Sequence, residues 1–252
     1  MFELRSAKTM TIVGMLRIKN EARWIERCIS SILPVCDRVL VMDDHSTDGT
    51  PDLCAAIPRV HVFPSPFEGL NETRDKNWLL EQVGKPDWII AIDGDEMLMP
   101  GCESKLVDAM KHPYYTALSF RIFYLWDRES QVRMDGVYGQ FRRESAFRPD
   151  GIARFGSTSA GGNFHCGNVP FQLRHKRNVT DEVKLLHFGY MHREDRIRKH
   201  AWYNDRDPNN WGEDCYQHIV IGDLLPATHR GRHGGPLELK PLEALCRVGT
   251  AA

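Results

Sequence analysis

The first half of the chain alternates short apolar runs with segments of helical periodicity. The runs are rich in β-branched residues and too short for helices, so they predict buried strands. Strands that alternate with helices form a mainly parallel sheet with right-handed crossovers, and the expected fold class is therefore α/β with helices flanking the sheet. The predicted strands are Thr11–Leu16, Arg38–Met42, Val60–Phe63, Asp87–Ile92 and Thr116–Trp126.

The segments between these strands carry helix start and stop signals. Apolar residues recur at helical spacing from Ile25 until Pro34 ends the pattern, and Asn20 offers an N-cap for this helix. Thr50 followed by Pro51 predicts the start of the next helix. A third helix is expected after Asn71, with an apolar side of Trp78, Leu79 and Val83, and a fourth after Pro100.

Beyond Asp127 the periodicity is harder to read, because Gly, Arg and His become frequent. We expect loops around Gly156–Gly167, a helix over Glu194–Asn204, and a Gly/Pro-rich tail after Pro226. No internal repeat divides the chain, so residues 1–252 are expected to form a single domain.

Composition narrows the class of protein. A hydrophobic content of 42% and a charged content of 27% are typical of soluble globular proteins. The apolar runs are shorter than the roughly 20 residues of a membrane-spanning helix, and the first ten residues resemble no secretion signal. The expected location is cytoplasmic, either free or peripheral at the inner membrane face. The seven cysteines form no CxxC pair, and we expect reduced thiols.

Acidic clusters follow two of the predicted strands directly. Asp43 and Asp44 end one strand, and Asp93, Asp95 and Glu96 end another. Ligands of open α/β sheets bind beyond the carboxyl ends of the strands. Like charges at close range repel and need a partner, and carboxylate oxygens suit Mg²⁺ or Mn²⁺. The pattern therefore predicts a divalent metal at this edge of the sheet.

Three segments together resemble the signature segments of family 2 glycosyltransferases. The resemblance covers residues 10–125 and extends more weakly to about 208. It implies a GT-A (Rossmann-like) fold in which residues 10–125 bind a nucleotide sugar, residues 126–225 form the acceptor side and carry a metal-binding histidine, and residues 226–252 form a tail. The segments are Ile18–Ala22, Arg38–Thr50 and Trp88–Glu96.

The resemblance implies roles for individual residues. Asp43 and Asp44 match the acidic pair that reads the nucleotide base and ribose, and Arg74 matches a basic residue near the base and phosphates. Asp93 and Asp95 match the DxD element, in which Asp95 binds the metal directly and Asp93 lies nearer the ribose and the metal waters.

Two further segments have matching positions. Asn20 and Glu21 match a pair that flanks the nucleotide pocket, with a helix cap and a first-turn carboxylate as the alternative. The segment Leu185–Met191 resembles the late histidine segment, in which His187 would complete the metal shell. A satisfied core histidine is the alternative.

The general base is where the sequence departs from the family pattern. Some relatives have a Glu after a histidine in the segment that matches Asn163–Asn168, and Cys166 stands at that position here. His165 and Asp135 are the preferred substitutes, and Glu194 or Asp195 is a further alternative. No arrangement around Cys166 favours a nucleophilic cysteine.

The resemblance implies an inverting, metal-dependent transfer from a UDP- or GDP-sugar to a hydroxyl of a saccharide or glycolipid. Two other interpretations stay open: transfer to hydroxylated bases of modified DNA, and an inactive nucleotide-binding module.

Basic residues interleaved with phenylalanines suit an anionic acceptor, nucleic acid, or a solvated surface beside the donor phosphates. The basic residues are Arg142, Arg143, Arg148, Arg154, Arg174, His175, Lys176, Arg177, Arg196, Arg198 and Lys199.

Overall fold

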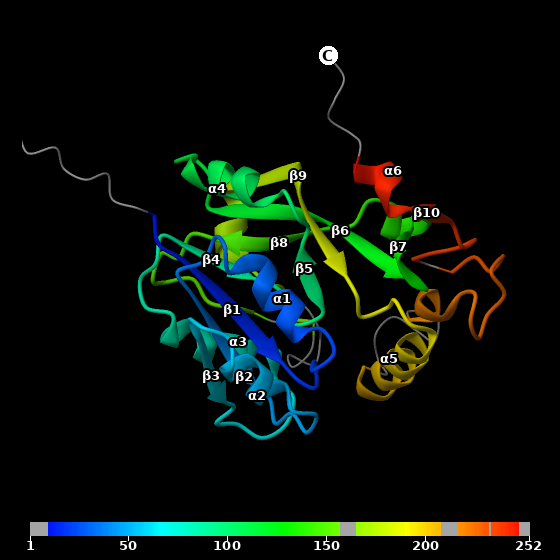
Figure 1. Ribbon diagram of the computed structural model, residues 1–252, viewed down its shortest axis with the longest axis horizontal. Helices are drawn as coiled ribbons and strands as arrows, with labels where there is room; N and C mark the ends of the chain where they lie inside the picture. Colours follow the sequence, from blue (N-terminus) through cyan, green and yellow to red (C-terminus); the bar gives the residue numbers. More distant parts are fainter. Residues whose placement is uncertain (1–9, 157–164, 208–215, 232, 247–252) are drawn as a thin grey trace, which may run out of the picture.

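The computed structural model describes residues 10–156, 165–207, 216–231 and 233–246. Within these residues a central sheet runs through the molecule in the order β10-β7-β6-β8-β4-β1-β2-β3 (Figure 1). Its parallel part confirms the predicted α/β class. The parallel strands are β1 (Ile12–Ile18), β2 (Arg38–Asp43), β3 (Val60–Pro64) and β4 (Trp88–Ala91).

The second half of the chain extends this sheet mainly with antiparallel pairings. Strand β8 joins β4 to β6, and β6 lies parallel to β9. Strand β5 pairs with β9, β7 with β6, and β10 with β7. The expected tail thus contributes an edge strand. The bounds are β5 (Glu96–Leu98), β6 (Ala117–Trp126), β7 (Arg128–Arg133), β8 (Arg142–Phe147), β9 (Arg177–His187) and β10 (Leu239–Pro241).

Apolar side chains on both faces of the parallel strands bury the sheet between two layers. Along β1, Leu16 and Ile18 pack on one face and Val13 and Met15 on the other. One face is covered by α1 (Ile25–Ile32), α2 (Thr50–Ala55) and α4 (Glu103–Lys111), and the other by α3 (Glu72–Gln82).

The predicted helix starts are confirmed for α2 and α3 but not for α1. Helix α3 is capped by Asn71, whose Oδ1 accepts from the Arg74 N–H over 2.9 Å. Asn20 does not cap α1, because that helix begins at Ile25. The backbone of Asn20 instead adopts a φ of 55°, and the Asn20 Oδ1 accepts a hydrogen bond from the Thr47 N–H over 2.8 Å. Asn20 therefore fastens the loop after β2.

The predicted helix of the second half is present as α5 (Arg193–Arg206). Short helices complete this half: η1 (Gly136–Gly139), η2 (Phe171–Lys176), η3 (Gln217–Val220) and α6 (Leu242–Cys246). Among the residues that the structure describes, none of the helices combines the length and apolar character that crossing a bilayer requires.

Candidate active site at the carboxyl edge of the sheet

The carboxyl ends of β1, β2 and β4 meet at one edge of the sheet. Ile18 of β1 lies opposite Asp43 of β2, and the Asp44 N–H donates to the Ile18 carbonyl over 2.8 Å. Strand β4 lies on the other side of β1 and leads into Asp93 and Asp95. The two acidic clusters therefore share the edge where ligands of such sheets bind.

His187 reaches this edge through the short strand β5. Glu96 of β5 lies opposite His187 of β9, and the Phe188 N–H donates to the Asp95 carbonyl over 2.8 Å. His187 Nε2 consequently lies 3.7 Å from Asp95 Oδ2. A residue distant in sequence thus stands beside the carboxylate with which it was expected to share a metal.

The acidic pair after β2 has one satisfied and one open member. Asp44 Oδ2 binds Arg17 Nη2 at 2.6 Å and Lys19 Nζ at 3.4 Å. Asp43 is buried, and its Oδ2 accepts from the Ser46 N–H over 3.1 Å. Asp43 Oδ1 is buried without a partner among the described residues. Because a buried acceptor is costly to leave unpaired, a ligand N–H or O–H is a suitable partner there.

Arg74 is held by its own neighbourhood. Its Nε donates to Asp75 Oδ1 over 2.9 Å, and its Nη2 donates to the Gly69 carbonyl over 2.8 Å. The guanidinium lies 4.3 Å from the centroid of the Phe67 ring. Its expected role beside the nucleotide stays a prediction.

Asp93 is paired with Arg143 of β8. Arg143 Nη1 lies 2.7 Å from Asp93 Oδ2, and Asn168 Nδ2 donates to Asp93 Oδ1 over 3.2 Å. Lys76 Nζ holds Asn168 in turn, at 2.9 Å from Oδ1. Burial raises the pKa of Asp93, but the charges of Arg143 and Lys76 outweigh it and lower the pKa well below its usual value. Asp93 is therefore ionised.

Asp95 is paired with Lys199 of α5, whose Nζ lies 2.6 Å from Oδ2. Burial raises the pKa of Asp95, but Lys199 and then His187 lower it below its usual value. The pair lies directly against Gly189, where an added Cβ would be 1.9 Å from Asp95 Oδ2 and 2.3 Å from Lys199 Nζ. A side chain at position 189 would therefore force the Asp95–Lys199 pair to move.

His187 is a neutral imidazole at this edge. Burial lowers its pKa to about 4. The ring packs against Tyr124 and Tyr190, with centroids 4.7 and 4.8 Å away, and Nδ1 is buried without a partner among the described residues. A neutral ring is the form that binds metals, so its charge state suits the expected role.

Two more carboxylates crowd the same region. Burial and then Asp95 raise the pKa of Glu21 to about 8. Burial likewise raises the pKa of Glu96 to about 7, although Arg143 contacts it. Glu21 packs so closely that a Cβ on Gly94 would lie 2.8 Å from its Cγ. Burial is the main cause of both raised pKa values, and the neighbouring charges of Asp93 and Asp95 add to it.

The residues fit a divalent cation only in part. Across the described residues, no group of three or more His, Cys, Asp or Glu side chains has the geometry of a metal site. Asp95 and His187 do face each other, and their oxygen and imidazole donors suit Mn²⁺. The crowded carboxylates favour an added cation. Asp93 faces Arg143, and Lys199 lies on the Asp95 oxygen that a metal would use.

Asp135 has contacts that favour a structural role over the predicted role of base. Both of its oxygens lie 2.8 Å from Arg133 nitrogens, and the carboxylate also accepts from the backbone N–H groups of Gly235 and Glu238. This set fastens the segment before β10 to the end of β7. A carboxylate satisfied in this way is a weak proton acceptor, so we do not retain Asp135 as the base.

His165 lies beside Tyr216 and Asp207. Its Nε2 is 2.6 Å from Tyr216 Oη and 3.4 Å from Asp207 Oδ2, and Tyr216 Oη donates to that Asp207 oxygen over 2.7 Å. Asn168, which bonds Asp93, lies three residues further along the chain. Residues 163 and 164 of the matching segment lie outside the described residues.

The remaining base candidates have other surroundings. Asp195 lies 3.2 Å from Arg23 Nη1, and Glu194 is exposed beside the same arginine. Cys166 is buried, and burial raises the pKa of its thiol, which does not favour a nucleophile.

Sequence reasoning gave no individual role to Arg143 or Lys199, the residues that pair the DxD carboxylates. Both appeared only among the basic residues of the second half. They come from β8 and α5, and no sequence spacing links either to Asp93 or Asp95. Asn168 likewise has no sequence signal beyond its place in the segment that matches the family.

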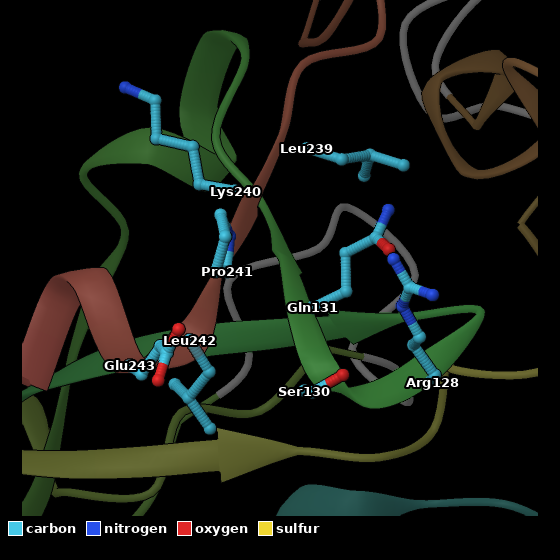
Figure 2. Close-up of a pocket in the computed structure, with 8 residues that line it drawn as sticks. All are labelled: Arg128, Ser130, Gln131, Leu239, Lys240, Pro241, Leu242 and Glu243. Carbon is cyan, nitrogen blue, oxygen red and sulfur yellow. The ribbon is translucent and has the colours of Figure 1, made fainter.

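A groove of about 740 Å³ lies elsewhere, between β7, β10 and the start of α6 (Figure 2). Its walls include Arg128, Gln131, Lys240 and Glu243. Its lining residues include no histidine and a single carboxylate, Glu243, in contrast to the sheet edge.

A family model confirms the class that the motifs predicted. The model for glycosyl transferase family 2 matches residues 16–168, which include both acidic clusters. The chain belongs to this family.

The matches to curated relatives cover from about half to nearly all of this chain. An uncharacterized protein of Mycobacterium tuberculosis is 26% identical over 93% of this chain and 61% of its own length. An uncharacterized glycosyltransferase of Rickettsia bellii is 27% identical over 54% of this chain and 46% of its own length. The chain thus spans about half to three fifths of the relatives that it matches.

Solved structures share the fold. TarS of S. aureus covers 85% of this chain with a TM-score of 0.52 and 14% identity, over 43% of the TarS chain. TarS 1–349 in complex with UDP has a TM-score of 0.50 and 12% identity, and the match covers 85% of this chain and 71% of that one. The GT-A architecture expected from the motifs is confirmed.

Proposed function

We propose that this chain transfers a sugar, with inversion, from a UDP- or GDP-sugar to a hydroxyl of a saccharide or glycolipid. The observation that carries the proposal is the meeting of Asp93, Asp95 and His187 at the carboxyl edge of the sheet, where a 3.7 Å gap separates Asp95 Oδ2 from His187 Nε2. Family membership and a solved TarS complex with UDP support the nucleotide donor.

The donor would bind along the edge. Asp43, whose Oδ1 lacks a partner among the described residues, would accept a hydrogen bond from the base or ribose, with Asp44 beside it. Asp95 and His187 would hold Mn²⁺ or Mg²⁺, with Asp93 nearer the ribose. A bound dication supplies positive charge to the departing diphosphate.

His165 would accept the proton of the acceptor hydroxyl. Burial lowers its pKa, so the imidazole is neutral near pH 7 and able to take a proton. Asp207 and Tyr216 lie within 3.4 Å of Nε2, and these contacts would orient the ring and stabilise its charged form.

A thermal-shift panel of UDP and GDP, each with Mn²⁺ or with EDTA, tests the binding half of this proposal. One nucleotide should raise the melting temperature with Mn²⁺ and lose most of that effect in EDTA. An equal shift in EDTA would contradict the metal assignment.

Donor turnover tests the chemistry. Metal-dependent donor hydrolysis should fall about 100-fold or more in Asp95→Ala, because the loss of a metal ligand costs several kcal/mol of transition-state stabilisation. Nucleotide binding without hydrolysis or transfer would indicate an inactive module. Transfer of labelled sugar to hydroxymethylated DNA but not to oligosaccharides would indicate the nucleic-acid acceptor.

A further inference from the structure

Lys199 occupies the side of Asp95 that a metal would need. Its Nζ lies 2.6 Å from Asp95 Oδ2, and His187 Nε2 faces that same oxygen from 3.7 Å. A dication bound to both Asp95 Oδ2 and His187 Nε2 would stand close to the ammonium and repel it. The two cations therefore compete for this oxygen.

The ion pair is built into the fold. Lys199 lies on α5, and its side chain is 17% exposed against 6% for Asp95. Gly189 makes room for the pair, since an added Cβ would lie 2.3 Å from Lys199 Nζ. The opposite carboxylate, Asp93, has its own cation in Arg143. Each acidic residue of the DxD element is thus neutralised by the chain itself.

Lys199 also contacts an aromatic ring. Its Nζ lies 5.3 Å from the centroid of the Tyr190 ring, a cation–π contact made while the ammonium is paired with Asp95. A flexible four-carbon stem allows the ammonium to leave the carboxylate while the backbone of α5 stays fixed.

We infer that Lys199 is a transferable cation, which neutralises Asp95 in the ligand-free protein, yields that oxygen to the incoming dication, and then binds the donor diphosphate beside the metal. This inference rests on the proposed function. Metal and nucleotide then bind cooperatively, because the diphosphate accepts the ammonium that the metal displaces. Lys199 would stabilise the leaving diphosphate together with the dication.

Titration of Mn²⁺ into the full chain, followed by the EPR signal of free Mn²⁺, tests the inference. Without nucleotide, Lys199→Met should bind Mn²⁺ about tenfold more tightly than the wild type, because no ammonium competes. With Mn²⁺ present, the same variant should bind UDP or GDP about tenfold more weakly. Lys199→Arg, which keeps the charge, should stay nearer the wild type in both measurements.

Lys111→Met is the matched control, because Lys111 is exposed on α4 and pairs only with Asp108 in its described contacts. It should change neither affinity. Unaltered or weaker Mn²⁺ binding by a folded Lys199→Met protein would overturn the inference while leaving the proposed function standing. Failure of the wild type to bind either nucleotide would instead overturn the proposed function.

Discussion

At the scale of single residues, the site is defined by how its carboxylates are neutralised. Only Gly94 separates Asp93 from Asp95 in the sequence, yet their cations come from β8 and α5. The motif predicted the acidic pair. It could not predict the cations Arg143 and Lys199, because only the tertiary structure brings them next to the carboxylates. His187 was predicted from its resemblance to a family segment, since a lone histidine among apolar neighbours carries little signal of its own.

Gly189 offers a test at this scale. Gly189→Ala should reduce turnover about 100-fold and weaken Mn²⁺-dependent nucleotide binding, because a Cβ 1.9 Å from Asp95 Oδ2 forces the carboxylate out of position. Gly156→Ala is the control, since no atom of the described residues lies within 4 Å of its added Cβ. Steady-state donor hydrolysis and thermal shifts measure the effect. Wild-type behaviour in Gly189→Ala would show that the Asp95 geometry matters less than proposed.

At the scale of elements, the two halves of the chain differed in predictability. Strands β1 to β4 are apolar on both faces, so their runs stand out in the sequence. Strands β7, β8 and β9 contain many charged residues and showed no clear period. Their formation depends on pairing with distant strands, which local patterns do not encode. The pairing that brings His187 to Asp95 belongs to this unpredicted part.

Helix α3 carries Arg74, Asp75 and Lys76, and its start depends on a local signal. Asn71→Ala should lower the free energy of unfolding by about 1 kcal/mol, because the Arg74 N–H loses its side-chain acceptor. Asn71→Asp, which keeps an acceptor oxygen, should stay close to the wild type. Urea denaturation followed by circular dichroism measures both. Equal destabilisation by the two substitutions would show that capping is not the cause.

At the scale of the whole molecule, buried polar contacts join segments of the C-terminal half to the sheet. Arg196 of α5 binds Asp223 and Asp127, and Arg133 of β7 binds Asp135 and the His218 carbonyl. Such ion pairs are costly to break once buried, so they fix the position of α5 and the segment before β10.

His218 makes stability depend on pH through this region. Burial, followed by His233 and Arg133, lowers its pKa to about 3, while Asp135 raises it and Tyr138 Oη lies 2.6 Å from Nδ1. The unfolded chain takes up a proton near pH 6.5 that the folded protein does not, so stability falls as the pH drops from about 6.5 toward 3.

Uptake of this one proton by the unfolded chain should lower the free energy of unfolding by about 1.4 kcal/mol for each pH unit of acidification within that range. Urea unfolding of the wild type and of His218→Gln at several pH values gives the free energy of unfolding as a function of pH. The difference between the two slopes isolates the contribution of His218, since His187 contributes equally to both proteins. Parallel stability curves would show that His218 is protonated in the folded protein.

The short ladder between β5 and β9 determines when the proposed site can form. During synthesis the acidic edge of the sheet emerges from the ribosome well before His187, and only the closing of this ladder sets the imidazole beside Asp95. Neighbouring residues of a strand point to opposite faces of the sheet. A shift of the β5–β9 register by one residue would therefore turn the His187 ring away from Asp95 and disrupt the proposed site. Under the proposed function, the chain therefore becomes able to bind its metal only late in folding.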